Sequence, residues 1–149
     1  MSAELIFDAR NATGESPVWH AAEQALYWAD IPAGRLYRWQ LADGQTQSWQ
    51  AEEMLACLAI HPAGGWLAGM QSGLFHLRPQ NDGSLQAERL AQVAHARPQM
   101  RFNDGRCDRQ GRFWAGTMLL DMAAGARVGA LYRYDGQLQQ VLDDLIVPN

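Results

Sequence analysis

The segment Arg101-Phe102-Asn103-Asp104-Gly105 places a guanidinium, an amide and a carboxylate next to a glycine. A short apolar strand, expected over 111–117, follows it behind a Gln-Gly turn. Polar groups just before a buried strand are typical of a ligand-binding or catalytic loop that a rigid sheet holds in place. A simpler interpretation is that Asn103-Asp104-Gly105 forms only a turn, because Asn and Asp cap their own backbone and Gly allows positive φ. The two roles are compatible.

The apolar strand belongs to a pattern that occurs three times. Its first part is Tyr27-Trp28-Ala29, then Trp66-Leu67-Ala68, then Phe113-Trp114-Ala115, and a second part follows at Leu36, Leu74 and Leu131. A period of roughly 40 to 50 residues with four strands per round is the signature of β-propeller blades. The sequence therefore predicts an all-β, partial β-propeller of four-stranded antiparallel blades. The single domain of residues 1–149 would hold about three blades, over 14–50, 55–93 and 101–143.

Composition narrows the classes of function. The net charge of -4 and the absence of a basic run do not favour a nucleic-acid partner. No apolar run approaches the roughly 20 residues that span a bilayer, and Met1–Glu4 lack the basic start of a secretory signal. Cys57 and Cys107 lack metal-binding spacing and are interpreted as reduced, mostly buried thiols. We therefore expect a cytoplasmic protein with neither a nucleic-acid nor a membrane partner.

Several motifs in order resemble one known family. They are Gly14-Glu15-Ser16-Pro17, Asp30-Ile31-Pro32, Arg101-Phe102-Asn103-Asp104-Gly105, Gly116-Thr117-Met118 and Gly129-Ala130-Leu131-Tyr132. Together they resemble the N-terminal half of the regucalcin/gluconolactonase family, also called the senescence marker protein family. The resemblance implies a six-bladed propeller that hydrolyses a sugar lactone with one divalent cation in its central channel.

The resemblance also assigns roles to individual residues. Glu15 and Asn149 would bind the metal, which is expected to be calcium, with zinc, manganese or magnesium as alternatives. Arg101 and Asn103 would bind the substrate, and Asp121 corresponds in position to an acidic residue that contacts the sugar in some members. No catalytic residue is expected in this chain, because the family's general-base Asp would come after residue 149.

Each assignment has an alternative. Glu15 could be a solvated surface charge, Arg101 a structural clamp on a loop carbonyl, and Asn149 a frayed terminus that binds nothing. At the level of the whole chain, the alternative to a lactonase is a non-catalytic propeller segment that binds a ligand or a protein, because fold alone does not decide function.

Three blades do not close a ring, because propellers have about four to eight. The chain is therefore expected to be an incomplete fragment with little activity of its own. Residues 3–9 would form a strand of the missing last blade. The uncovered sides of the outer blades would favour self-association.

Overall fold

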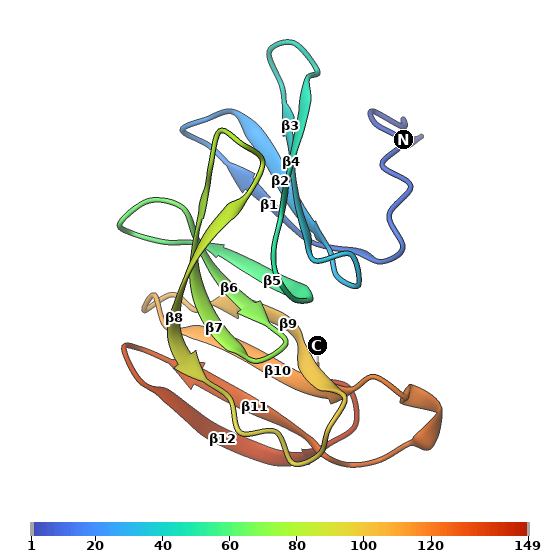
Figure 1. The fold of residues 1–149 in the computed structure, drawn as a ribbon, viewed down its shortest axis with the longest axis vertical. Helices are drawn as coiled ribbons and strands as arrows, with labels where there is room; N and C mark the ends of the chain where they lie inside the picture. The colour runs from blue at the N-terminus through green and yellow to red at the C-terminus, as the bar shows by residue number, and fades with distance from the viewer. Residues whose placement is uncertain (1, 149) are drawn as a thin grey trace.

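The computed structural model describes residues 2–148, which form three four-stranded antiparallel sheets (Figure 1). The first contains β1 (Gly14–His20), β2 (Ala25–Asp30), β3 (Arg35–Gln40) and β4 (Thr46–Gln50). The second contains β5 (Leu55–Ile60), β6 (Trp66–Met70), β7 (Gly73–Pro79) and β8 (Leu85–Gln92). The third contains β9 (Met100–Cys107), β10 (Phe113–Leu119), β11 (Gly129–Tyr134) and β12 (Leu138–Leu145). In each sheet the strands are ordered as in the chain, which confirms the predicted four-stranded blades.

The burial of each strand follows from its place in this arrangement. The middle sheet is covered on both sides, and its strands β5 and β6 are almost continuously buried. Their sequences, Leu-Ala-Cys-Leu-Ala-Ile and Trp-Leu-Ala-Gly-Met, are accordingly apolar without alternation. The last strands β4 and β12 are mostly exposed and carry Gln, Ser and Asp side chains. In the middle sheet, the change from apolar β5 and β6 to the mostly exposed β8 shows which edge of the sheet faces the interior.

The core consists of two layers, one on each side of the middle sheet. One layer joins the first and second sheets around Tyr27, Leu55 and Trp66. The other joins the second and third sheets around Leu67, Phe102 and Phe113. Gly69 lets the sheets approach closely, because a Cβ there would lie 2.6 Å from Cys57 Sγ and 3.3 Å from Phe102 Cβ. Burial between sheets therefore holds the three blades together.

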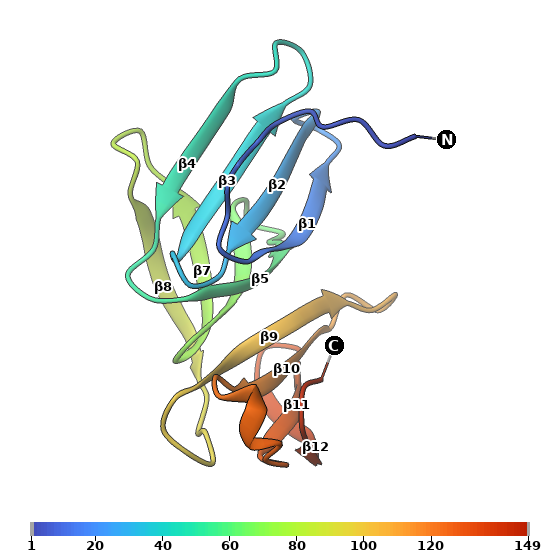
Figure 2. The ribbon, with the colours of Figure 1, turned by 90° about the vertical axis from the view of Figure 1, so that its right-hand side faces the viewer.

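The first strands of the three sheets lie against one another. Strand β5 contacts β1 on one side and β9 on the other. Figure 2 shows β5 between them, with the C-terminal end of the chain beside β9 and β10. Segments that are far apart in the sequence are thereby brought to one region of the molecule.

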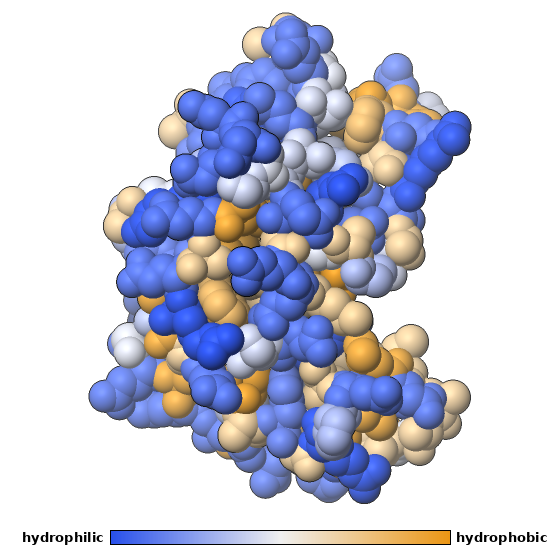
Figure 3. Space-filling view, viewed as in Figure 1, coloured by the Kyte–Doolittle hydropathy of each residue, from blue (hydrophilic) through white to orange (hydrophobic). Residues whose placement is uncertain are grey.

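The N-terminal segment does not form a strand in this structure. No strand is assigned over 2–11. Ile6 and Phe7 lie instead against the side of the first sheet, where the ring centroids of Phe7 and Trp28 are 6.1 Å apart. Leu5 is 78% exposed, and hydrophobic surface gathers over this segment at the upper right of Figure 3. A strand over 3–9 that belongs to a further blade stays a prediction, because a strand needs a neighbour with which to pair.

Helical structure is limited to one 3₁₀ turn in the part of the chain that the structure describes, η1 at Met122–Ala124 between β10 and β11. Within residues 2–148 no helix has the length and apolar character to cross a bilayer. Cys57 is buried as expected, but Cys107 is exposed, because it ends β9 at the turn into β10.

Asp108 organises that β9–β10 turn. Its carboxylate accepts backbone N–H bonds from Gln110 at 2.9 Å and Arg112 at 3.0 Å, and a bond from the Trp114 indole at 2.8 Å. Partial burial raises the pKa of Asp108, but the bonds from Trp114, Arg112 and Gln110 outweigh it and lower the pKa from 3.8 to about 2. The ionised carboxylate therefore stabilises the folded state.

We expect the free energy of unfolding of Asp108→Asn to depend less on pH in the acid range than that of the wild type. Because the folded pKa of Asp108 lies below its unfolded value, its contribution is present above about pH 4 and is lost as the pH falls toward 2. Urea unfolding at a series of pH values measures this, with Asp43→Asn at an exposed turn as the control. Equal pH dependence in wild type and Asp108→Asn would contradict the prediction.

Candidate functional site

Glu15 is exposed, but the backbone that carries it is fixed. The pairing of β1 with β2 shifts register between Glu15 and Val18, which marks a β-bulge. Ser16, the next residue, has a φ of 54°, an uncommon value for a residue other than glycine. Its side chain is buried, and Oγ accepts a hydrogen bond of 2.9 Å from the backbone N–H of Leu58 on β5. The bulge that presents Glu15 is thus fastened to the neighbouring sheet.

Arg101 and Asn103 are joined directly on β9. Arg101 Nη1 donates to the Asn103 Oδ1 atom at 3.0 Å and to the backbone carbonyl of Phe102 at 2.8 Å. Burial lowers the pKa of Arg101 below its ordinary value, while electrostatic interactions with Cys57 and with the Glu15 carboxylate act in the opposite direction. Glu15 is therefore near enough to stabilise the charge of Arg101. The two side chains interact only at longer range, because no ion pair joins them among the described residues.

The segment from Arg101 to Gly105 lies within strand β9, rather than in the loop that the sequence predicted. The pairing of β9 with β10 shifts between Phe102 and Gly105, so this segment also carries a bulge. Asp104 Oδ1 accepts a hydrogen bond of 2.8 Å from the N–H of Gly105, a local cap of the kind that the turn interpretation predicted. A bulge re-aims the side chains that would otherwise alternate across the sheet.

The two remaining predicted residues lie elsewhere or outside the described part. Asp121 is exposed on the β10–β11 connection, where it precedes η1 without a side-chain cap bond. Asn149 lies outside the described residues. Its neighbour Pro148 accepts a hydrogen bond of 3.2 Å from Asn103 Nδ2 and packs over Gly116, where an added Cβ would lie 2.4 Å from the Pro148 ring. The last described residue therefore contacts the candidate site.

Residues 2–148 do not complete a metal site. No group of three or more His, Cys, Asp or Glu side chains among them could hold an ion. At the candidate site, Glu15 offers an exposed carboxylate of the kind that hard cations prefer. The described part of the chain could therefore supply one oxygen ligand to a metal ion.

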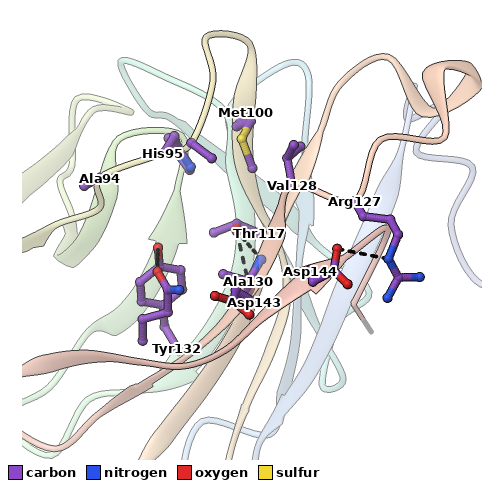
Figure 4. Close-up of a pocket in the computed structure, with 12 residues that line it drawn as sticks. Ala94, His95, Met100, Thr117, Arg127, Val128, Ala130, Tyr132, Asp143 and Asp144 are labelled. Carbon is purple, nitrogen blue, oxygen red and sulfur yellow. Dashed lines mark hydrogen bonds and ion pairs between the residues drawn. The ribbon is translucent and has the colours of Figure 1, made fainter.

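A separate pocket of about 380 Å³ lies between the β8–β9 connection and the third sheet (Figure 4). Several of its polar groups have hydrogen-bond or ion-pair partners, although among the described residues His95 Nδ1 is buried without one. Arg127 pairs with Asp144 at 3.0 Å, the Tyr132 hydroxyl bonds to Gln140 at 3.2 Å, and His95 Nε2 bonds to the Gln71 carbonyl at 2.7 Å. Its lining does not include Glu15 or Arg101. We therefore place the candidate site at the first strands.

Fold and site together define part of a β-propeller, and comparison with known proteins identifies its family. Residues 13–149 match the profile described as the SMP-30/Gluconolactonase/LRE-like region. The chain belongs to this family, which confirms the resemblance seen in the sequence.

Two named relatives indicate how much of the family fold is present. The 6-deoxy-6-sulfogluconolactonase of Pseudomonas putida is 41% identical over 138 residues, covering 91% of this chain and 46% of the relative. The regucalcin of Danio rerio is 33% identical over 132 residues, covering 89% of this chain and 43% of the relative. The chain therefore spans about half the length of the curated relatives it matches.

Solved structures agree on the fold. A calcium-binding protein, regucalcin, from Agrobacterium tumefaciens superposes with a TM-score of 0.74 at 28% identity, over 90% of this chain and 44% of that one. A luciferin-regenerating enzyme superposes with a TM-score of 0.82 over 91% of this chain and 47% of that one, but at 18% identity it supports the fold alone.

The sequence interpretation gave no role to two residues that shape the site, Ser16 and Pro148. Ser16 lies inside the motif that drew attention to Glu15, so its place in the motif is the one signal that could have found it. The contact of Pro148 with Asn103 depends on the path of the chain after β12, for which the local sequence carries no signal.

We expect Ser16→Ala to destabilise the fold by about 1–3 kcal/mol, because it leaves the buried N–H of Leu58 without its acceptor. Ser84→Ala is the matched control, since the Ser84 hydroxyl bonds to Asp82 at an exposed turn. Chemical unfolding measures both variants. A Ser16→Ala protein as stable as Ser84→Ala would show that the bond between the sheets contributes little.

Proposed function

We propose that this chain is the first part of a metal-dependent enzyme that hydrolyses a sugar lactone. The observation that carries the proposal is that β5 packs against both β1 and β9, the strands that carry the two family motifs, so that the Glu15 carboxylate lies near enough to raise the pKa of Arg101. Membership of the SMP-30/gluconolactonase family supports the same reaction class. The relative from Pseudomonas putida is named for a sulfonated gluconolactone, so sugar lactones with a 6-sulfonate are included in the proposed substrate class.

Glu15 and Asn149 would hold the divalent cation, together with an Asp from a later part of the protein. Calcium is the expected ion, in line with the description of the Agrobacterium regucalcin as a calcium-binding protein. The cation would supply Lewis acidity toward the lactone carbonyl. Glu15 suits the ligand role because its carboxylate is exposed while its backbone is fixed.

Arg101 and Asn103 would bind and orient the lactone. Nη1 of Arg101 makes both of its protein bonds, and among the described residues no hydrogen bond engages Nε or Nη2. A guanidinium has five N–H donors in a fixed plane, so these remaining donors could hold ring or hydroxyl oxygens of a sugar. Asn103 would keep the guanidinium in position and would hold the carbonyl and hydroxyl oxygens of the substrate through its amide. Asp121 would contact the sugar if the β10–β11 connection folded over the site.

Ring opening consumes a water molecule, whose oxygen attacks the carbonyl carbon as the ring C–O bond breaks. A general base must accept the proton from this water. We assign that role to an Asp outside this chain, as the family resemblance implies. The 149-residue chain would therefore bind a lactone weakly, with little catalysis of its own.

The proposal predicts a metal-dependent rate only when the remaining blades are present. A pH-stat assay with gluconolactone and 6-deoxy-6-sulfogluconolactone should give a rate near buffer for the 149-residue chain. The protein extended through the remaining blades should give a rate that chelation abolishes and that Glu15→Ala lowers by roughly a hundredfold or more, as expected for a lost metal ligand.

Glu88→Ala is the matched control, because Glu88 is an exposed carboxylate on the β8 strand that pairs with Arg78. A metal-dependent rate from the 149-residue chain would contradict the assignment of the base to a later segment. A fully active Glu15→Ala protein would contradict the metal assignment itself.

A further inference from the structure

Asp30 is a buried carboxylate at the end of β2, and only 5% of its surface is exposed. It lies opposite Gly14 in the β1–β2 pairing, one residue away from the pair formed by Glu15 and Ala29. A buried carboxylate is stable only when its oxygens accept hydrogen bonds. The groups that donate hydrogen bonds to Asp30 therefore show which segment its carboxylate holds in place.

Among the described residues, every group that donates a hydrogen bond to the Asp30 carboxylate belongs to the loop that leads into Glu15. Oδ1 accepts the backbone N–H of Thr13 at 3.0 Å, and Oδ2 accepts the N–H of Ala12 at 3.2 Å. The side-chain amide of Asn11 adds a third bond at 3.4 Å. One carboxylate thus binds three successive residues immediately before the Gly14–Ser16 segment.

Two further contacts lock the same loop. Asn11 Oδ1 accepts the indole N–H of Trp28 at 2.8 Å, and the Trp28 ring stacks on Tyr37 with centroids 5.2 Å apart. Asn11 also lies over Gly14, where an added Cβ would be 3.1 Å from Asn11 Oδ1. The loop is therefore held between Asp30 and a rigid aromatic pair.

We propose that Asp30 is the positioning residue for Glu15. Its carboxylate fixes the backbone entering Glu15 from the side of the first sheet, while Ser16 fastens the backbone leaving it to the second sheet. These contacts alone support the claim that Asp30 holds the Gly14–Ser16 segment in place. The further claim that this affects cation binding rests on the function proposed above, in which Glu15 is a ligand.

Asp30→Asn tests this with little change in volume, because an amide keeps one acceptor oxygen and places an NH₂ group against an N–H of the loop. Asp108→Asn is the matched control. Asp108 also accepts two backbone N–H groups and side-chain bonds, but at the β9–β10 turn rather than before Glu15. Any general effect of losing a turn-forming carboxylate should appear in both variants.

The first measurement is amide hydrogen exchange of the metal-free 149-residue chain. Asp30→Asn should accelerate exchange at 12–16 and leave the β9–β10 turn unchanged, and Asp108→Asn should do the reverse. Unchanged exchange at 12–16 in Asp30→Asn, or equal acceleration in both variants, would overturn the positioning role.

The second measurement is the affinity of the protein extended through the remaining blades for Tb³⁺, a luminescent probe for calcium-type oxygen sites. Asp30→Asn should weaken binding by about 10- to 100-fold, the usual cost of removing a residue that orients a metal ligand, and Asp108→Asn should leave it unchanged. If Glu15→Gln and wild type give equal Tb³⁺ results, the metal role of Glu15 fails, while hydrogen exchange still decides whether Asp30 holds the segment. If Glu15→Gln weakens binding but Asp30→Asn does not, Asp30 has no part in positioning the ligand.

Discussion

Burial of apolar strands between neighbouring sheets is the interaction on which the rest of this structure depends. The middle sheet is apolar on both faces and is stable only when a sheet covers each side, as the two core layers around Trp66 and Phe102 do. This packing sets β5 against both β1 and β9. Without it, the separate sheets that carry Glu15 and Arg101 would not be held near each other.

Two β-bulges then determine the directions in which the side chains of the candidate site point. Both motif segments fall on β-bulges, one between Glu15 and Val18 and the other between Phe102 and Gly105. A regular strand points alternate side chains to its two faces, whereas a bulge changes this direction and bends the strand. Each bulge is held by side chains, with Ser16 bonded to Leu58 and Arg101 to Asn103. The two bulges therefore hold an exposed carboxylate on β1 and a half-buried guanidinium on β9 in fixed positions.

The sequence predicted the three sheets because their signal is repeated and local. The threefold aromatic-apolar-small pattern around Ala29, Ala68 and Ala115 lies in β2, β6 and β10, and Asp-Gly and Ser-Gly turns separate the strands. The motifs around Glu15 and Arg101 were recognisable for the same reason, since each is contiguous in the chain.

Features that depend on partners distant in the sequence were not predictable in this way. Bulge register is set by the opposing strand, so the Arg101 segment was expected in a loop but lies in β9. The exposure of Cys107 depends on where β9 ends, and the bond of Ser16 to Leu58 depends on how two sheets dock. Residues 3–9 have strand-like composition but no strand assignment here, because pairing requires a neighbour.

The central claim is that the first strands of the outer sheets place Glu15 and the Arg101 motif around one cation-binding region. Paramagnetic broadening by Mn²⁺ in the protein extended through the remaining blades tests it most directly, because the ion broadens the NMR signals of nearby nuclei. The account predicts selective loss of the backbone signals of 14–16 and of the Asn103 side-chain amide. The Asn81 side-chain amide, on the β7–β8 turn, should remain sharp. Broadening at Asn81 with sharp signals at Glu15 and Asn103 would contradict the account.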